Sequence, residues 1–202
     1  MNPNISLGRF LGLVLLLLIP SFFVWMLIDS WLAWPAVWLS DVVFRFWMPD
    51  VVATIQLQGS NALVMTHFGE LKNVIVSAEQ AGYQMGFPAD VRLLSYSIPF
   101  YAALHFSTPQ SESLGNFSIG LWVLLVLIFL GLISVTLKNL MLGLGQPFFD
   151  QAAVFLPNGQ LIAIFYQLSI LIVPPLAPII IWAWQSRNKP LMMQFSTLHN
   201  SG

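Results

Sequence analysis

Long apolar segments surround one polar-patterned stretch along this chain. The apolar runs are Phe10–Trp34, Ser118–Leu140 and Leu161–Trp184, and each is long enough for the roughly 18–20 residues that a helix needs to cross about 30 Å of hydrocarbon. Between the first two runs, Val51–Arg92 mixes polar and apolar positions as a unit folded outside the bilayer does. The pattern therefore predicts an α-helical integral membrane protein with one small β-rich extracytoplasmic insertion.

The first apolar run predicts a transmembrane anchor over residues 1–34. Its apolar stretch is longer than the core of a signal peptide, so we expect it to be retained. After Pro35, residues 35–50 place Asp41 and Arg45 at i, i+4 on one solvated face, which is typical of a short helix lying in the membrane interface. The alternative is that the first helix continues past Pro35.

The insertion, residues 51–92, carries the two-residue period of half-buried strands. Val51–Gln58 alternates polar and apolar side chains, Gly59-Ser60-Asn61 supplies a turn, and Ala62–Phe68 returns as a second strand. Two further extended segments are predicted, Asn73–Ser77 and Gly82–Arg92. They are needed because a lone hairpin is marginally stable in water.

Residues 93–186 are predicted to form a transmembrane bundle of three further helices. The ambiguous member is Leu93–Phe106, which is short and contains Pro99. Its length favours a re-entrant or interfacial piece over a full crossing.

The positions of the few charges favour a crossing there. Arg9 precedes the first apolar run, and Arg187 and Lys189 follow the last, so both termini are expected on the cytoplasmic side of the membrane. Termini on one side require an even number of crossings. We therefore expect about four transmembrane helices and a cytoplasmic tail over 187–202, although Lys138 then falls at the outer end of a helix.

Two sets of polar residues are candidates for interaction sites. Asp29, Arg92 and Lys138 fall near the outer ends of predicted helices, where ionisable side chains pair or face a cavity. The competing interpretation is that they snorkel and only mark the water boundary.

The second set lies on the predicted strands. Thr54, Gln56 and Thr66 mark strands whose edges could pair with an extended peptide by strand addition. That mode fits a protein that binds a partner or an exported substrate.

Composition excludes several classes of function. Only 7% of residues are charged, the net charge is -1 and no Lys or Arg run occurs, so nucleic-acid binding is not supported. The chain has no Cys, which excludes thiol catalysis and disulfides. His67 and His105 have no His, Asp or Glu at metal-ligand spacing. We therefore assign no catalytic, cofactor-binding or metal-binding residue.

One segment carries a family resemblance. Ala89-Asp90-Val91-Arg92-Leu93-Leu94-Ser95-Tyr96-Ser97-Ile98-Pro99-Phe100-Tyr101-Ala102-Ala103-Leu104 follows a strand-rich stretch and an anchor ending in Leu32-Ala33-Trp34-Pro35. This arrangement resembles the exosortase H-associated membrane protein family. The resemblance implies a bacterial inner-membrane accessory that accompanies an exosortase, a membrane enzyme that processes proteins bearing a C-terminal sorting signal. It transfers no catalytic residues, and a chain without Cys cannot be the Cys-dependent exosortase itself.

The leading hypothesis is a non-enzymatic accessory that binds a membrane sorting enzyme or its exported substrate. The alternative is a small transporter or channel component that uses Asp29, Arg92 and Lys138. An intramembrane enzyme built on His67 or His105 comes third.

Overall fold

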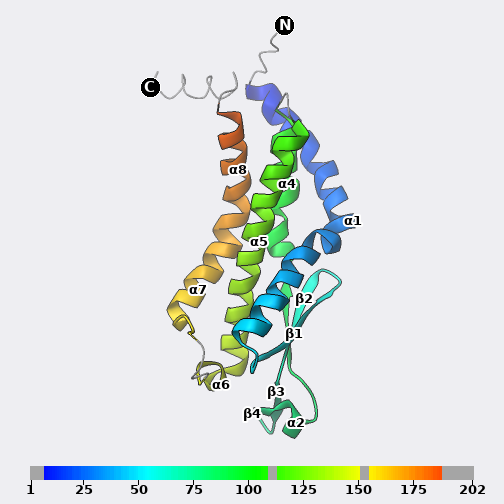
Figure 1. The fold of residues 1–202 in the computed structure, drawn as a ribbon. Helices are drawn as coiled ribbons and strands as arrows, with labels where there is room; N and C mark the ends of the chain where they lie inside the picture. Colours follow the sequence, from blue (N-terminus) through cyan, green and yellow to red (C-terminus); the bar gives the residue numbers. More distant parts are fainter. Residues whose placement is uncertain (1–6, 109–112, 151–154, 188–202) are drawn as a thin grey trace. The chain divides into compact units, whose positions relative to one another are not determined.

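The long apolar runs are helical in the computed structural model, which describes residues 7–108, 113–150 and 155–187 (Figure 1). Three described helices are long and apolar enough to cross a membrane: α1 (Leu7–Trp47), α5 (Ser113–Leu144) and the continuous helix Gly159–Ser186. The last is made of α7 (Gly159–Gln167), the π-helical turn η1 (Leu168–Ile172) and α8 (Val173–Ser186). Of the expected tail over 187–202, residues 188–202 lie outside the described residues.

The expectation of about four transmembrane helices is wrong, because the described residues contain three candidate spans. The segment expected to supply another one is divided into α3 (Arg92–Ser95) and α4 (Ser97–Phe106). The 10 residues of α4 reach about 15 Å at 1.5 Å per residue, half of the hydrocarbon thickness. Pro99 is the third residue of α4, within the first turn, where proline is tolerated.

α1 is one continuous helix, as in the alternative that the helix extends past Pro35. A separate helix over 35–50 is not found, and Pro35 removes only one backbone donor from a helix of 41 residues. The predicted pair is confirmed, since Arg45 Nη2 lies 2.5 Å from Asp41 Oδ2. Asp41 is nevertheless buried, at 7% exposure, because its carboxylate also accepts hydrogen bonds from the sheet.

The predicted hairpin is confirmed as the first two strands of a three-stranded antiparallel sheet. β1 (Val52–Gln58) pairs with β2 (Asn61–Thr66), and β2 also pairs with β5 (Gly86–Asp90), which gives the order β1-β2-β5. Gly59 adopts φ 62° in the tight turn between β1 and β2, a conformation that glycine adopts without steric cost.

A second, two-stranded sheet follows in the chain. β3 (Phe68–Leu71) pairs with β4 (Val74–Ser77) across a turn in which Lys72 and Asn73 both have positive φ, 53° and 65°. This is the type I′ geometry that suits the twist of a two-residue hairpin. The sequence predicted β4 but assigned Phe68 to the preceding strand, because neither Lys72 nor its neighbours form the Asn-Gly or Asp-Gly signal of such a turn. The short helix α2 (Ala78–Ala81) follows, capped by the Ser77 side chain.

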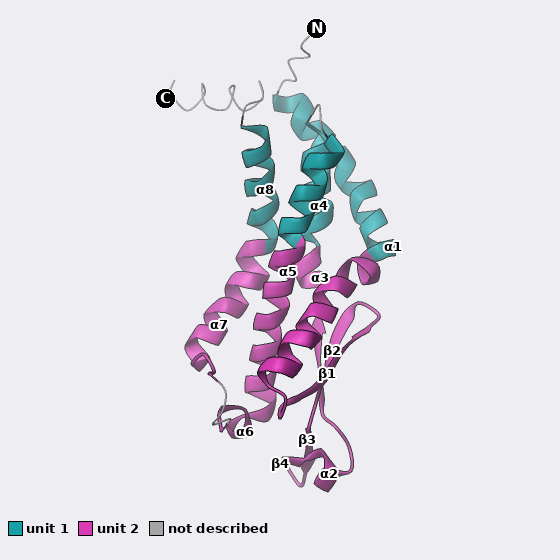
Figure 2. Ribbon diagram, in the orientation of Figure 1, with its two compact units in different colours: residues 1–28, 96–124, 174–202 teal, residues 29–95, 125–173 magenta. Residues whose placement is uncertain are grey.

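Two compact units are distinguished by colour in Figure 2. Unit 1 comprises residues 1–28, 96–124 and 174–202, and unit 2 comprises residues 29–95 and 125–173. Unit 2 contains both sheets and the short helix α6 (Gln146–Phe149). Within it, Gly143 of α5 leaves the space that the ring of Phe87 of β5 occupies.

Unit 1 is joined by a buried polar network around Tyr101 of α4. The Tyr101 hydroxyl lies 2.8 Å from Gln185 Oε1 of α8 and 3.1 Å from the Asn116 carbonyl of α5. Gln185 Nε2 donates to the same carbonyl at 2.7 Å. His105 of α4 is fully buried, and its Nε2 lies 2.8 Å from the Ser113 carbonyl. These contacts connect α4 to the first turn of α5 and the last turn of α8.

The π-helical turn precedes two consecutive prolines in the last long helix. Pro174 and Pro175 have no N–H to donate, and a proline ring crowds the carbonyl of residue i−4. The Val173 N–H instead bonds Leu168 O, five residues back, so the helix widens locally. The prolines therefore change the hydrogen-bond pattern without interrupting the helix, which runs on to Ser186.

We predict that Gly120→Ala destabilises the protein, whereas Gly115→Ala in the same helix does not. A Cβ at Gly120 would overlap the Tyr101 hydroxyl, while a Cβ at Gly115 meets no atom within 4 Å. Tyr101 cannot move aside because its ring is fully buried and its hydroxyl is hydrogen-bonded. Thermal unfolding in detergent should show a lower Tm for Gly120→Ala and an equal or higher Tm for Gly115→Ala. Equal Tm values for both variants would contradict this close packing.

Candidate functional site

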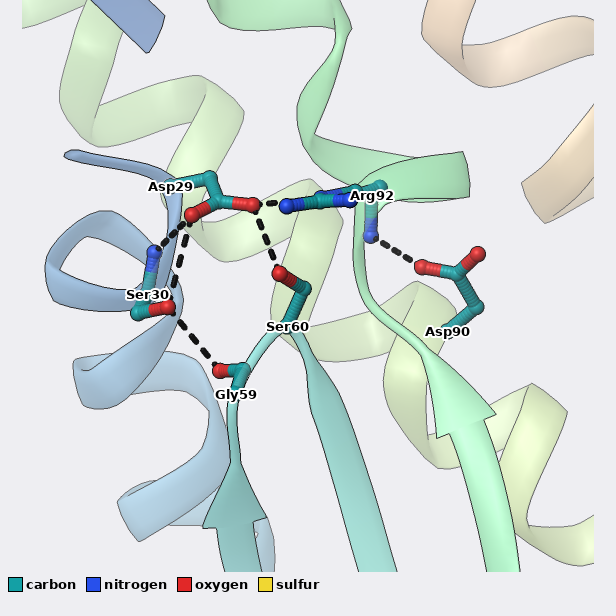
Figure 3. A network of polar contacts seen from close by, with 6 residues as sticks. All are labelled: Asp29, Ser30, Gly59, Ser60, Asp90 and Arg92. Carbon is teal, nitrogen blue, oxygen red and sulfur yellow. Dashed lines mark hydrogen bonds and ion pairs between the residues drawn. The ribbon is translucent and has the colours of Figure 1, made fainter. Parts of the chain in front are cut away.

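The Asp29 carboxylate is the centre of a polar network that joins three parts of unit 2 (Figure 3). Oδ2 accepts hydrogen bonds from Arg92 Nε at 2.5 Å and from Ser60 Oγ at 2.8 Å. Oδ1 accepts the Ser30 backbone N–H at 2.7 Å. Asp29 is only 6% exposed, and the ion pair with Arg92 compensates its buried charge.

Further hydrogen bonds to the neighbouring backbone hold the partners of Asp29 in place. Ser60 lies in the tight β1–β2 turn, where Ser30 Oγ donates to the Gly59 carbonyl at 2.9 Å. Arg92 begins α3, and its backbone N–H donates to Asp90 Oδ1 at 2.9 Å. The network thus fixes the β1–β2 turn and the start of α3 to α1. Its geometry is that of a structural clasp, because both Asp29 oxygens are occupied by donors from the protein.

The third residue of this predicted set has other contacts. Lys138 Nζ lies 4.9 Å from the centre of the Tyr166 ring and 3.3 Å from Asn139 Oδ1. The structure therefore brings Asp29 and Arg92 together, and it gives Lys138 a cation–π contact and a polar neighbour of its own.

The strand residues predicted to bind a partner are already engaged within unit 2. Thr66 is on the central strand β2 and is fully buried, with its Oγ1 3.0 Å from the Met85 carbonyl. Thr54 Oγ1 donates to Asp41 Oδ1 at 3.1 Å. Gln56 is exposed on the edge strand β1, but its neighbour Ile55 donates its backbone N–H to Asp41 Oδ1 at 2.7 Å.

Helix side chains are therefore bonded to both edges of the three-stranded sheet. Asp41 of α1 binds the edge formed by β1, as described above. At the other edge, Asn139 Nδ2 of α5 donates to the Pro88 carbonyl of β5 at 3.0 Å, and Pro88 has no N–H to offer a partner. The sequence could not indicate these contacts, because the residues that make them are 14 and 51 positions apart.

In the two-stranded sheet, the outer edge of β4 differs from these bonded edges. On β3, the Glu70 carbonyl accepts from Tyr83 Oη at 3.0 Å and the Phe68 carbonyl from the Met85 N–H at 2.7 Å, so both carbonyls point away from β4. Glu70 is paired with Ile75, and opposed residues of an antiparallel pair orient their backbone groups alike. The N–H and C=O of Ile75 therefore point away from β3, and they have no hydrogen-bond partner within the described part of the chain.

Apolar side chains are exposed around this open edge. Leu71 is 48% exposed and its cross-strand partner Val74 is 59% exposed. Tyr83, which is 52% exposed, lies on the opposite side of β3 with its hydroxyl on the Glu70 carbonyl. We call residues 68–83 the β3–β4 tip. The tip combines unpaired backbone groups with apolar side chains, and sequence reasoning missed it because β3 was not predicted as a separate strand.

The histidines are placed separately. His105 is buried against the rings of Tyr101 and Phe117, whereas His67 is exposed between β2 and β3. Within the described ranges there is no group of three or more His, Asp or Glu side chains that could hold a metal ion.

Comparison with known families identifies the class of membrane protein to which this chain belongs. Residues 4–189 match the sequence profile of the exosortase H-associated membrane proteins. The chain belongs to this family. The resemblance of Ala89–Leu104 is therefore confirmed, and the protein is a membrane protein associated with exosortase H. No curated protein and no solved structure matches the chain.

We predict that Asp29→Ala lowers the free energy of unfolding by about 1–3 kcal/mol, because it leaves the Arg92 guanidinium and the Ser60 hydroxyl without their acceptor. Asp50→Asn is the matched control, since Asp50 is an exposed carboxylate of the same unit. Denaturant unfolding in mild detergent measures both variants. A double-mutant cycle of Asp29→Asn and Arg92→Gln should give a favourable coupling energy. Unfolding of Asp29→Ala that matches the control would show that the clasp contributes nothing to stability.

Proposed function

We propose that this exosortase H-associated protein is a non-enzymatic accessory that holds a partner protein or an exported substrate at the β3–β4 tip. The observation that carries the proposal is the open edge of β4, where the backbone N–H and C=O of Ile75 point outward without a partner in the described chain. An extended peptide supplies the complementary groups by adding a strand.

The side chains around the edge support the same mode of binding. A strand as short as β4 offers few backbone hydrogen bonds, which by itself limits unwanted pairing. Exposed Leu71 and Val74 add an apolar contact beside the edge. Backbone pairing would hold any extended segment, and the apolar pair would select segments with apolar side chains at matching positions.

We further propose that the protein lies in the bacterial inner membrane with both termini in the cytoplasm. With three candidate spans, this arrangement requires the segment from β5 through α4 to return the chain to the side on which α1 begins. Within unit 1, Phe10 near the start of α1 stacks on Trp182 near the end of α8, with ring centres 5.2 Å apart. Leu104 at the end of α4 packs in the same cluster. The basic residues Arg9 and Arg187 thus flank one end of this unit, which favours the cytoplasmic side. The β3–β4 tip follows the candidate span α1 in the chain, so a single crossing by α1 would make the tip extracytoplasmic.

The transporter alternative gains no specific support from the polar cluster. Asp29 and Arg92 neutralise each other, and Lys138 is in contact with Tyr166 and Asn139. A transport site would require such charges to face a substrate, so the accessory role remains the proposal.

We predict that a photo-crosslinking amino acid at Val74 captures a protein of the exosortase system in intact membranes. The same probe at Gln56 is the matched control, because Gln56 is exposed on a strand whose edge is bonded to Asp41. Crosslinked products should be identified by mass spectrometry as exosortase H or a protein with a C-terminal sorting signal. Capture at Gln56 but not at Val74 would contradict the assignment to the β4 edge.

We predict that single cysteines report opposite sides of the membrane for the tip and for the ends of the described chain. The chain has no native Cys, so Lys72→Cys, Gly8→Cys and Arg187→Cys can each be labelled without background. A membrane-impermeant maleimide should label Lys72→Cys in cells with a permeabilised outer membrane, and the other two only after lysis. Labelling of Gly8→Cys and Arg187→Cys with unequal accessibility would contradict termini on one side.

A further inference from the structure

The second half of α1 carries both of its carboxylates on the face that bonds the sheet. Residues 29–47 of α1 belong to unit 2 together with the three-stranded sheet (Figure 2). Asp29 and Asp41 are buried and accept hydrogen bonds from the β1–β2 turn and from β1. Other buried positions of this stretch recur at the same helical spacing: Ala33, Ala36, Val37, Ser40 and Phe44.

The opposite face of the same stretch is exposed and apolar. Its side chains recur every three or four residues and are Trp31, Trp34, Pro35, Trp38, Leu39, Val42, Arg45 and Phe46. Trp31 is 83% exposed and Phe46 is 90% exposed. Within residues 29–47, all of which the structure describes, Arg45 is the one charged side chain on this face, and it is paired with Asp41. We call these residues the outer face of α1.

This distribution is the reverse of that on a helix that covers a domain in water. Such a helix buries its apolar side and turns its charged side to solvent. Within a membrane, ionisable side chains instead face the protein interior, and the lipid-facing side is apolar. The three tryptophans of the outer face lie within about two helical turns, and tryptophan is enriched at the headgroup level. The outer face therefore has the chemistry of a surface that contacts lipid.

The length of α1 determines where this face lies along the membrane normal. Residues 7–28 extend about 33 Å, which is enough for the roughly 30 Å of hydrocarbon, and residues 29–47 add about 28 Å. In an upright helix, Val42 and Phe46 would therefore be exposed to water beyond the headgroups. A tilt of about 40°, the upper end of the observed range, shortens α1 to about 47 Å along the normal. That length is close to the roughly 40–45 Å of a bilayer with its headgroups.

We propose that the outer face of α1 is a lipid-contact surface, and that residues 31–46 lie obliquely in the headgroup region with this face toward the acyl chains. The surface is continuous along one helix with the apolar window that makes α1 a candidate span. Because Asp29 and Asp41 bond the sheet to the inner face, β1 is held at the membrane surface and does not project from it. This contact is separate from the β4 edge and does not depend on the accessory role proposed above.

The test places nitroxide labels at single cysteines in the full chain, reconstituted in vesicles of phosphatidylethanolamine and phosphatidylglycerol. Oxygen concentrates in lipid and a nickel chelate stays in water, so the ratio of their collision rates reports the surroundings of each label. Labels at Trp38→Cys, Val42→Cys and Phe46→Cys should collide more with oxygen. Lys72→Cys in the β3–β4 tip is the matched water reference, and Leu16→Cys, at an exposed apolar position of α1, is the lipid reference.

More frequent collisions with nickel than with oxygen at Val42→Cys and Phe46→Cys would overturn the proposal, because the helix would then leave the membrane. Rare collisions with both reagents would overturn it too, since a second copy of the chain would then cover this face.

The unsubstituted protein provides a second measurement that does not rely on any variant. A phosphatidylcholine with a photoreactive diazirine in its acyl chain should modify peptides that contain residues 31–46 in preference to peptides that contain β3 and β4. Mass spectrometry of the digested protein measures this preference. Modification that is absent from residues 31–46, or equal in both regions, would overturn the proposal.

Discussion

Two carboxylates on one helix determine how unit 2 is built. Asp29 and Asp41 are 12 positions apart on α1, which corresponds to about 18 Å along a helix axis. Asp29 binds Ser60 just after β1, and Asp41 binds Ile55 within β1. Between these two donors, Ile55–Gln58 is extended strand, about 10 Å long, and Gly59 and Ser60 form the turn. The two carboxylates on α1 therefore hold β1 against the helix at two points, within the strand and at the turn that ends it.

The sequence was informative wherever local period and local chemistry decide the structure. Alternation over Val51–Gln58 predicted β1, and the turn residues that follow predicted its pairing with β2. The i, i+4 spacing predicted the Asp41–Arg45 ion pair. The sequence could not decide whether α1 continues past Pro35. The free-energy cost of Pro35 is local, whereas the stability gained by holding β1 against one uninterrupted helix depends on contacts between residues distant in sequence.

In the candidate site too, the sequence predicted some contacts from local patterns and could not predict those between distant segments. Asp29 and Arg92 were grouped because both fall at the ends of apolar runs, and the structure joins them through Ser60, which had been noted only as a turn residue. Lys138 satisfied the same positional criterion, yet its partner Tyr166 lies in another helix that no local pattern relates to it. The β4 edge was not identifiable at all, since it depends on which strand β4 pairs with and on Tyr83 and Met85 occupying the opposite side of β3.

The brevity of β4 has a consequence for how long any complex at the tip would last. An edge of 4 residues exchanges backbone hydrogen bonds only at alternate positions, so the contact relies on very few bonds and on the Leu71–Val74 pair. Affinity differences between related complexes arise mostly from dissociation rates. An edge of this length therefore favours rapid release, which suits a protein that passes a segment onward and does not store it.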